Sequence, residues 1–201
     1  MKKVFLSTIF IACILFASSA DAYARLPISF SGQIGYALPQ GTAFEVDGES
    51  MTRFGLGVDV DVLWHFNQMN YRLGVGLAYN TSLLFGADLE GLSDAGLYTL
   101  NLFGVRGYYR FLDSRISPFG ALTVGLAQFS VPEMTFGNTT IPAEHAFGFG
   151  IRPEIGVEFR SFIISVGYMI PMSYSFDGEP SVTAGSFQFS LGTRINLFSR
   201  N

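Results

Sequence analysis

Charge and cysteine are both scarce in this chain of 201 residues. Charged residues make up 14% of it, against about a quarter in an ordinary soluble domain, so a water-facing surface would be hard to cover. The formal net charge is −4 and the sequence has no basic cluster, which argues against nucleic acid as a partner. The only cysteine, Cys13, lies in an N-terminal apolar run, so we expect no disulfide in the mature chain.

Long apolar runs are also absent after residue 24. A membrane-spanning helix needs roughly 20 consecutive apolar residues, and no later segment supplies them. Yet the mean hydropathy is +0.35 and aromatic residues reach 15%. In lipid, the other way to satisfy every backbone N–H and C=O group is a closed β-barrel. The composition therefore favours a barrel that lies in a membrane.

The N-terminal apolar run has the form of an export signal. Lys2 and Lys3 precede the apolar residues 4–17, and mostly small residues follow at positions 18–24. We predict a cleaved signal peptide over residues 1–22, with removal after Ala22 or Ala24, and a barrel domain over residues 25–198. An uncleaved membrane anchor is the alternative, and lipidation of Cys13 is a minor one.

Every second residue is apolar over segments of about ten residues, which is the period of β-strands. In the clearest segment, Phe54, Leu56 and Val58 alternate with glycine and aspartate. We predict an all-β, eight-stranded antiparallel up-and-down transmembrane β-barrel, with strands near residues 28–38, 53–64, 71–79, 97–111, 119–129, 147–159, 162–172 and 186–198. The apolar residues of the fourth strand change parity, which predicts a β-bulge near Phe103 or Gly104.

The connections between the predicted strands alternate in length. Short ones at 65–70, 112–117 and 160–161 alternate with long ones at 39–52, 81–96, 130–144 and 173–185. Bacterial outer-membrane barrels have short periplasmic turns and longer outer loops. We therefore expect the chain in the bacterial outer membrane, with both termini in the periplasm and the long loops extracellular.

Aromatic residues near the strand ends are expected to form the two interfacial girdles of such a barrel. The predicted periplasmic girdle contains Trp64, Phe66, Tyr71, Phe111, Phe119, Phe159, Phe162 and Phe198, and the outer girdle contains Tyr36, Phe54, Tyr79, Phe129, Phe147, Tyr168 and Phe187.

The face opposite the apolar one is mostly Gly, Ala and Ser, with arginine and carboxylate residues at intervals. A soluble lipocalin-like barrel would turn this face to water, but its lack of lysine suits a narrow interior better. Unpaired ions there would be unfavourable, whereas arginine can hold a carboxylate through two hydrogen bonds. We predict an ion-pair plug inside the barrel, formed by Arg53, Asp59, Asp61, Arg72, Arg106, Arg152, Glu154, Glu158 and Arg194. A selectivity lining is the alternative for the same residues.

Acidic residues gather in the four long connections, which contain no arginine. They are Glu45, Asp47, Glu49, Asp88, Glu90, Asp94, Glu133, Glu144, Asp177 and Glu179. A solvated, repulsive rim is the simplest interpretation, and binding of divalent cations or of a basic partner is the alternative. The spacing over residues 45–49 does not match a calcium-binding loop, so we predict no metal site and no cofactor.

Enzyme motifs are missing. Outer-membrane lipid deacylases have a serine two residues after their histidine, whereas His145 is followed by Phe147 at that position. We expect no serine and acid beside His65, and a lone histidine near an interface is more often structural. The sequence has no zinc spacing, nucleotide loop or paired-carboxylate motif. We predict that the protein is not an enzyme.

Taken together, these features resemble the small eight-stranded outer-membrane proteins, the group that includes the OmpA membrane domain, OmpX and OmpW. The segment Ser190-x-Gly192-x-x-Ile195-x-Leu197 is similar to the C-terminal strand signal that the barrel-insertion machinery reads. The resemblance implies outer-membrane lipid and that machinery as partners. An external ligand at the loops is a further candidate.

Three functions remain open at this point. The closed interior and long loops favour a structural or surface-interaction barrel. Resemblance to OmpW implies instead a narrow channel for small hydrophobic molecules, with Met134, Phe136, Ile141, Met172, Tyr174 and Phe176 as the candidate lining. An enzyme that modifies membrane lipid is the third, and it lacks a recognisable nucleophile.

Overall fold

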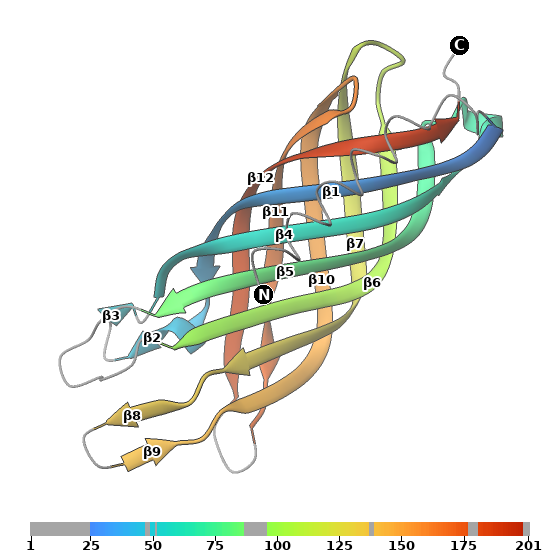
Figure 1. Ribbon diagram of the computed structural model, residues 1–201. Helices are drawn as coiled ribbons and strands as arrows, with labels where there is room; N and C mark the ends of the chain where they lie inside the picture. The colour runs from blue at the N-terminus through green and yellow to red at the C-terminus, as the bar shows by residue number, and fades with distance from the viewer. Residues whose placement is uncertain are drawn as a thin grey trace, which may run out of the picture.

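The structure, a computed structural model, describes residues 25–46, 49–50, 52–86, 96–136, 139–176 and 181–198. Within them, eight long antiparallel strands close into one up-and-down barrel, and the last strand pairs with the first (Figure 1). They are β1 (Arg25–Gln40), β4 (Thr52–His65), β5 (Leu73–Gly86), β6 (Leu97–Arg110), β7 (Ile116–Val131), β10 (Glu144–Phe159), β11 (Phe162–Tyr174) and β12 (Val182–Phe198). The predicted fold class is confirmed. The predicted signal peptide lies outside the described residues.

The connections between these strands contain short elements of secondary structure. The hairpins β2 (Glu45–Val46) with β3 (Glu49–Ser50), and β8 (Met134–Phe136) with β9 (Thr139–Ile141), lie beyond one end of the barrel (Figure 1). Two 3-10 turns, η2 (Thr42–Phe44) and η3 (Asn67–Met69), complete the described elements. No helix in this part of the chain is long and apolar enough to cross a membrane.

Long and short connections lie at opposite ends of the barrel, here called the loop side and the turn side (Figure 1). At the turn side, left-handed φ angles of 49° at Asn70 and 58° at Tyr71 close one turn, and φ 55° at Arg160 closes another. β1 begins and β12 ends at this side, where Arg25 lies opposite Phe198. On the loop side most strands continue beyond their predicted ends; β5, for example, stays paired with β6 as far as Phe85.

The outward face of the barrel is apolar. Alternation along each strand leaves large side chains such as Ile34, Phe149 and Leu191 exposed, and Ile155 keeps 68% of its surface accessible. Trp64 and Phe162 near the turn side and Tyr36 and Phe147 near the loop side are exposed as well. A continuous band of this kind is the surface that a transmembrane barrel presents to lipid.

Two aromatic residues differ from the girdle prediction. Phe119 and Phe129 are 1% and 0% exposed, because they lie on the inward face of β7 together with Thr123 and Ala127. Residues of one parity share one face of a strand, so these rings fill the interior instead of reaching the membrane interface.

The β-bulge predicted near Phe103 or Gly104 is absent. β6 pairs with β5 and β7 without a shift of register over this region. Leu100 and Leu102 point inward, whereas Phe103 and Val105 point outward. The change of parity in the sequence therefore marks a part of the interior that is apolar, and the prediction was wrong because it assumed a polar interior throughout.

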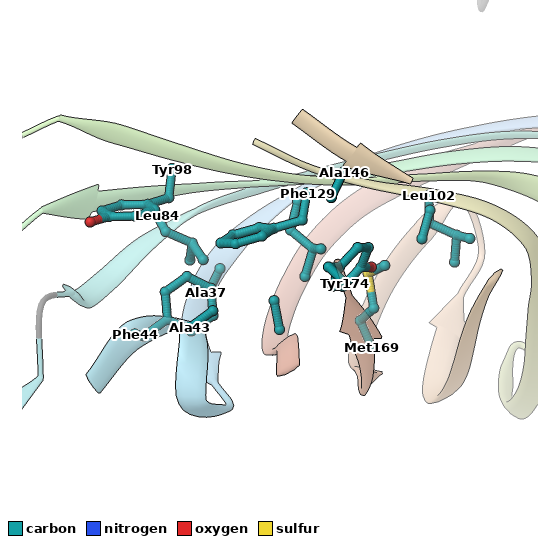
Figure 2. Packing of buried hydrophobic residues seen from close by; sticks show 13 residues of the cluster. Ala37, Ala43, Phe44, Leu84, Tyr98, Leu102, Phe129, Ala146, Met169 and Tyr174 are labelled. Atoms are coloured by element: carbon teal, nitrogen blue, oxygen red, sulfur yellow. The ribbon is translucent and has the colours of Figure 1, made fainter. Parts of the chain in front are cut away.

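The interior has three layers along the barrel axis. The turn-side layer contains Leu63, Tyr108, Phe119 and Ile163. An ionic layer follows in the middle, since Asp61 precedes Leu63 on β4 and Arg106 precedes Tyr108 on β6. The loop-side layer is a larger apolar cluster (Figure 2), formed by Ala37, Ala43, Phe44, Leu84, Tyr98, Leu100, Leu102, Ala127, Phe129, Ala146, Met169, Tyr174 and Ala184.

Candidate functional site

Three arginines and three carboxylates form the ionic layer, and all six are buried. They are Asp59 and Asp61 of β4, Arg106 of β6, Arg152 and Glu154 of β10 and Arg194 of β12. Opposite charges alternate through a continuous series of contacts, in the order Arg194, Asp61, Arg106, Glu154, Arg152, Asp59. Every charge in the layer therefore has an opposite charge beside it.

Glu154 is the centre of this series. Its Oε1 accepts a hydrogen bond from Arg106 Nη2 at 3.0 Å and its Oε2 accepts one from Arg106 Nη1 at 3.1 Å, so this guanidinium holds the carboxylate through two parallel bonds. Arg152 Nη1 donates to Oε2 at 2.6 Å, and Gln33 Nε2 donates to Oε1 at 3.2 Å. Loss of Glu154 would leave two buried guanidinium groups without their common partner.

Asp59 ends the series on one side. Its Oδ2 accepts hydrogen bonds from Arg152 Nη2 at 2.8 Å and Gln188 Nε2 at 2.9 Å, and its Oδ1 accepts one from Asn80 Nδ2 at 2.8 Å. Glycine provides the room for these groups, because a Cβ atom at Gly167 would collide with the Arg152 guanidinium.

Asp61 and Arg194 end the series on the other side. Asp61 Oδ2 lies 3.2 Å from Arg106 Nε and 3.4 Å from Arg194 Nη2. The Arg194 guanidinium carbon also lies 4.1 Å from the ring centre of Tyr108, a cation–π contact. This contact joins the ionic layer to the turn-side layer, and the Tyr108 hydroxyl donates to Glu158 Oε2 at 2.7 Å.

Of the nine residues predicted for the plug, six lie in the ionic layer and Glu158 is buried next to it. Arg72 lies elsewhere: it precedes β5 in an exposed turn, where its Nε donates to Asp113 Oδ2 at 2.8 Å. This hydrogen bond raises the pKa of Arg72 above its usual value. The prediction for Arg72 was wrong because the turn runs through Tyr71 and the strand begins only at Leu73. The side chain of Arg53 lies outside what the structure describes.

Neutral polar residues that the prediction omitted complete the layer. Thr123 Oγ1 accepts a hydrogen bond from Arg106 Nη1 at 3.3 Å, and Ser165 Oγ donates to Gln33 Oε1 at 2.7 Å. With Asn80 and Gln188, these residues bring a side chain from each of the eight barrel strands into one network. Their inward parity, shared with the ions, is the sequence signal that could have identified them.

The loop-side layer is organised around Phe129. Its ring centre lies 5.5 Å from that of Phe44, 5.6 Å from that of Tyr174 and 6.4 Å from that of Tyr98. Figure 2 shows these four residues in one cluster with Leu84 and Met169. Phe44 belongs to η2 and not to a barrel strand, yet it is only 2% exposed.

The predicted channel lining is found here in part. Tyr174 is a buried member of the loop-side layer. Met172 and Phe176 are partly buried and pack against this layer. The side chains of Met134, Phe136 and Ile141 lie outside the part of the chain whose side chains are described.

Solved structures of other proteins share this architecture. The crystal structure of Neisserial surface protein A superposes with a TM-score of 0.56 at 14% identity, over 85% of this chain and 97% of that one. The attachment invasion locus protein Ail of Yersinia pestis, solved with the heparin analogue sucrose octasulfate, gives a TM-score of 0.52 at 16% identity, over 85% of this chain and 100% of that one. The chain has the fold of the small eight-stranded outer-membrane barrels. No family model and no curated protein matches the sequence.

At the turn side of this outer-membrane barrel fold, a serine lies beside His65, for which the sequence predicted no combination of a serine and an acid. Ser29 Oγ lies 2.7 Å from His65 Nε2, and His65 Nδ1 lies 3.0 Å from the carbonyl oxygen of Tyr71. Because that carbonyl can only accept, we assign the ring proton to Nδ1, so Nε2 accepts from the Ser29 hydroxyl. Both side chains are buried in the interior, so the pair has the orientation of a nucleophile and base without access to a substrate.

The acidic residues of the loop side are described only in part. Glu45, Glu133 and Glu144 are exposed, and the side chains of the other acidic residues predicted there lie outside the described set. Across the described residues, no group of three or more His, Cys, Asp or Glu side chains is placed to hold a metal ion. The described interior is therefore a packed, ion-paired core, and the described acids of the loop side face solvent.

Proposed function

We propose that this protein is a bacterial outer-membrane barrel with a structural or surface-interaction role and a closed interior. The outward apolar band supports a position in lipid, and the alternation of long and short connections supports an orientation with the turn side and both termini in the periplasm. The loop side then faces the cell exterior, where the exposed acids Glu45, Glu133 and Glu144 meet solvent or an external ligand.

The observation that carries this proposal is the network of the ionic layer, to which all eight strands contribute a side chain. An eight-stranded barrel is only just wide enough for its own side chains. A solute passing through would have to separate Arg106 from Glu154 or Arg152 from Asp59 and so leave buried charges without their partners, which is strongly unfavourable. We therefore propose that the barrel does not conduct ions.

The proposed partners follow from this placement. Outer-membrane lipid covers the apolar band, and the barrel-insertion machinery reads the segment from Ser190 to Leu197 at the end of β12. The long connections are the proposed site for an external ligand.

Ion conductance tests the proposal. The mature chain is refolded, its folding is verified by a heat-dependent shift in gel mobility, and it is then inserted into a planar bilayer. We expect no discrete conductance steps above those of protein that was heated until the folded mobility was lost. Steady steps from the folded sample alone would contradict the closed interior and favour a permeation path along the inward arginines and carboxylates.

Two other functions receive less support. The apolar loop-side layer is compatible with the loop-side end of a narrow channel for small hydrophobic molecules. The ionic layer, however, lies across the barrel interior between this end and the turn side. In a lipid-modifying enzyme, Ser29 would be the candidate nucleophile because it lies beside His65. Its side chain is buried inside the barrel, however, and is therefore separated from lipid. We propose that the protein is not an enzyme, so Ser29→Ala should leave any lipid hydrolysis by the refolded protein at the background rate.

A further inference from the structure

We propose that the loop-side layer is a binding site for a small apolar molecule that carries one hydrogen-bond acceptor, and that Phe44 occupies this site when it is empty. The proposal goes beyond the closed interior, because the ligand would enter and leave at the loop side without crossing the ionic layer. It rests on three observations: the origin of Phe44, the way its segment is held, and an unpartnered hydroxyl group next to its ring.

Phe44 fills the layer from outside the barrel wall. Tyr98, Phe129 and Tyr174 belong to β6, β7 and β11, whereas Phe44 belongs to η2 in the connection after β1. Its ring packs edge-on against Tyr98 and Phe129, with centres 5.9 Å and 5.5 Å apart. This ring can therefore leave the layer without breaking a strand ladder, which the wall residues cannot do.

The segment that carries Phe44 is attached by a few exposed hydrogen bonds and by the burial of Ala43 beside Phe44. Thr42 N donates to Thr183 Oγ1 at 3.1 Å, Thr183 N donates to Thr42 Oγ1 at 3.0 Å, and the two hydroxyl oxygens lie 3.2 Å apart. Gly41 turns the chain into the barrel mouth with φ 112°, so close to Thr183 that a Cβ atom would collide with its carbonyl oxygen. Exposed hydrogen bonds of this kind open more readily than those of a buried ladder.

Tyr174 gives the site its polar specificity. Its side chain is 0% exposed, and its hydroxyl has no hydrogen-bond partner among the described residues. The ring lies against Gly148, where a Cβ atom would be 3.5 Å from Tyr174 Cε1, and its centre is 5.6 Å from that of Phe129. A buried hydroxyl without a partner is unfavourable, so a ligand acceptor should bind more tightly beside Tyr174 than beside a phenylalanine in its place. Because one phenylalanine ring would be displaced, we expect a ligand of about that size.

Two probes of equal shape test this inference. Acetophenone has a carbonyl acceptor where α-methylstyrene has a methylene group, so the two differ mainly in hydrogen bonding. Binding is followed by NMR of isotope-labelled methionine methyl groups in the refolded mature chain, with Met169 as the reporter because it is a buried member of the layer. The Met169 signal is assigned with Met169→Leu, and folding of each variant is checked by gel mobility.

Removal of Phe44 should open the site. In Phe44→Ala we expect a saturable shift of the Met169 signal with both probes. The ratio of acetophenone affinity to α-methylstyrene affinity should be about 2- to 10-fold higher in Phe44→Ala than in Phe44→Ala/Tyr174→Phe, the effect of one hydrogen bond. A folded Phe44→Ala protein without a saturable shift, or an equal ratio in the two variants, would overturn the proposal.

The natural release of Phe44 is tested separately. Thr183→Ala should raise the affinity of the otherwise unchanged chain for acetophenone, because it favours the open state of the segment, and it should have no effect when Phe44→Ala is already present. Equal affinity of wild type and Thr183→Ala would overturn the role of Phe44 as a displaceable occupant. None of these results depends on conductance, so failure of this inference is distinguishable from failure of the proposed function.

Discussion

The ionic layer and the loop-side layer fill the same barrel in opposite ways. Glu154 is fixed by directional bonds to Arg106, Arg152 and Gln33, so each partner specifies the position of the others. Phe129 is surrounded by rings that contact it without such direction, and one of them, Phe44, comes from a connection. We infer that closure of the interior depends on the ionic layer, whereas the loop-side layer can change its contents with the barrel intact.

The largest effect is expected from breaking the ionic layer at its centre. Glu154→Ala leaves Arg106 and Arg152 buried with one carboxylate partner fewer. We expect it to lower the free energy of unfolding by about 4 kcal/mol. Urea unfolding of the refolded protein in lipid vesicles measures this loss, and Glu144→Ala, which removes an exposed carboxylate of the same strand, is the matched control.

Urea unfolding also measures the interaction between Arg152 and Glu154 within the ionic layer. In Arg152→Ala/Glu154→Ala both charges of one contact are absent, so the double variant should lose less stability than the two single variants add up to, by about 1 kcal/mol or more. Strictly additive losses would show that these residues do not act as one unit.

A smaller loss is expected from the loop-side layer. Leu102→Ala deletes buried methyl groups next to Ala127 and Met169, and we expect it to lower the free energy of unfolding by about 3 kcal/mol. Leu126→Ala is the matched control, since Leu126 is 57% exposed on the outward face of the adjacent strand. Because Leu102 and Glu154 belong to different layers, the losses from Leu102→Ala and Glu154→Ala should add. A large departure from additivity would contradict the division of the interior into separate layers.

Glycine on the barrel wall makes room for the ionic layer. Gly167→Ala places a methyl group against the Arg152 guanidinium, and we expect it to destabilise the barrel by about 2 kcal/mol through overpacking. Gly107→Ala is the control, because a Cβ atom there would meet no heavy atom within 4 Å. The effect of Gly167→Ala should vanish in an Arg152→Ala background, and its persistence there would show that the guanidinium is not what the methyl group meets.

Strand order and the charged members of the ionic layer could be predicted from the sequence because both follow from local periodicity. Once alternate residues such as Phe54, Leu56 and Val58 are known to face lipid, Asp59 and Asp61 must face inward. A narrow interior then requires that such charges meet partners, whatever the register between strands.

Features that depend on register or on a connection could not be predicted in the same way. Ser29 meets His65 from 36 positions away, through the pairing of β1 with β4. Phe44 lies in a connection, where no period indicates its direction. Leu100 and Leu102 were misread because alternation specifies which residues share a face, but not whether the inward face is polar at that depth.

The smallest effect is expected where an ion pair lies outside the barrel interior. Arg72 and Asp113 keep 34% and 38% of their side-chain surface exposed, so water and salt screen the attraction that is unscreened between Arg152 and Glu154. Asp113 also retains Arg110, whose Nη2 donates to Oδ1 at 2.7 Å, when Arg72 is removed. We expect the urea midpoint of Arg72→Ala to equal that of wild type at low and at high salt, whereas Arg152→Ala unfolds at much lower urea in both. A loss of comparable size in the two variants would mean that burial does not distinguish these ion pairs, and that the turn after β4 is as important for stability as the ionic layer.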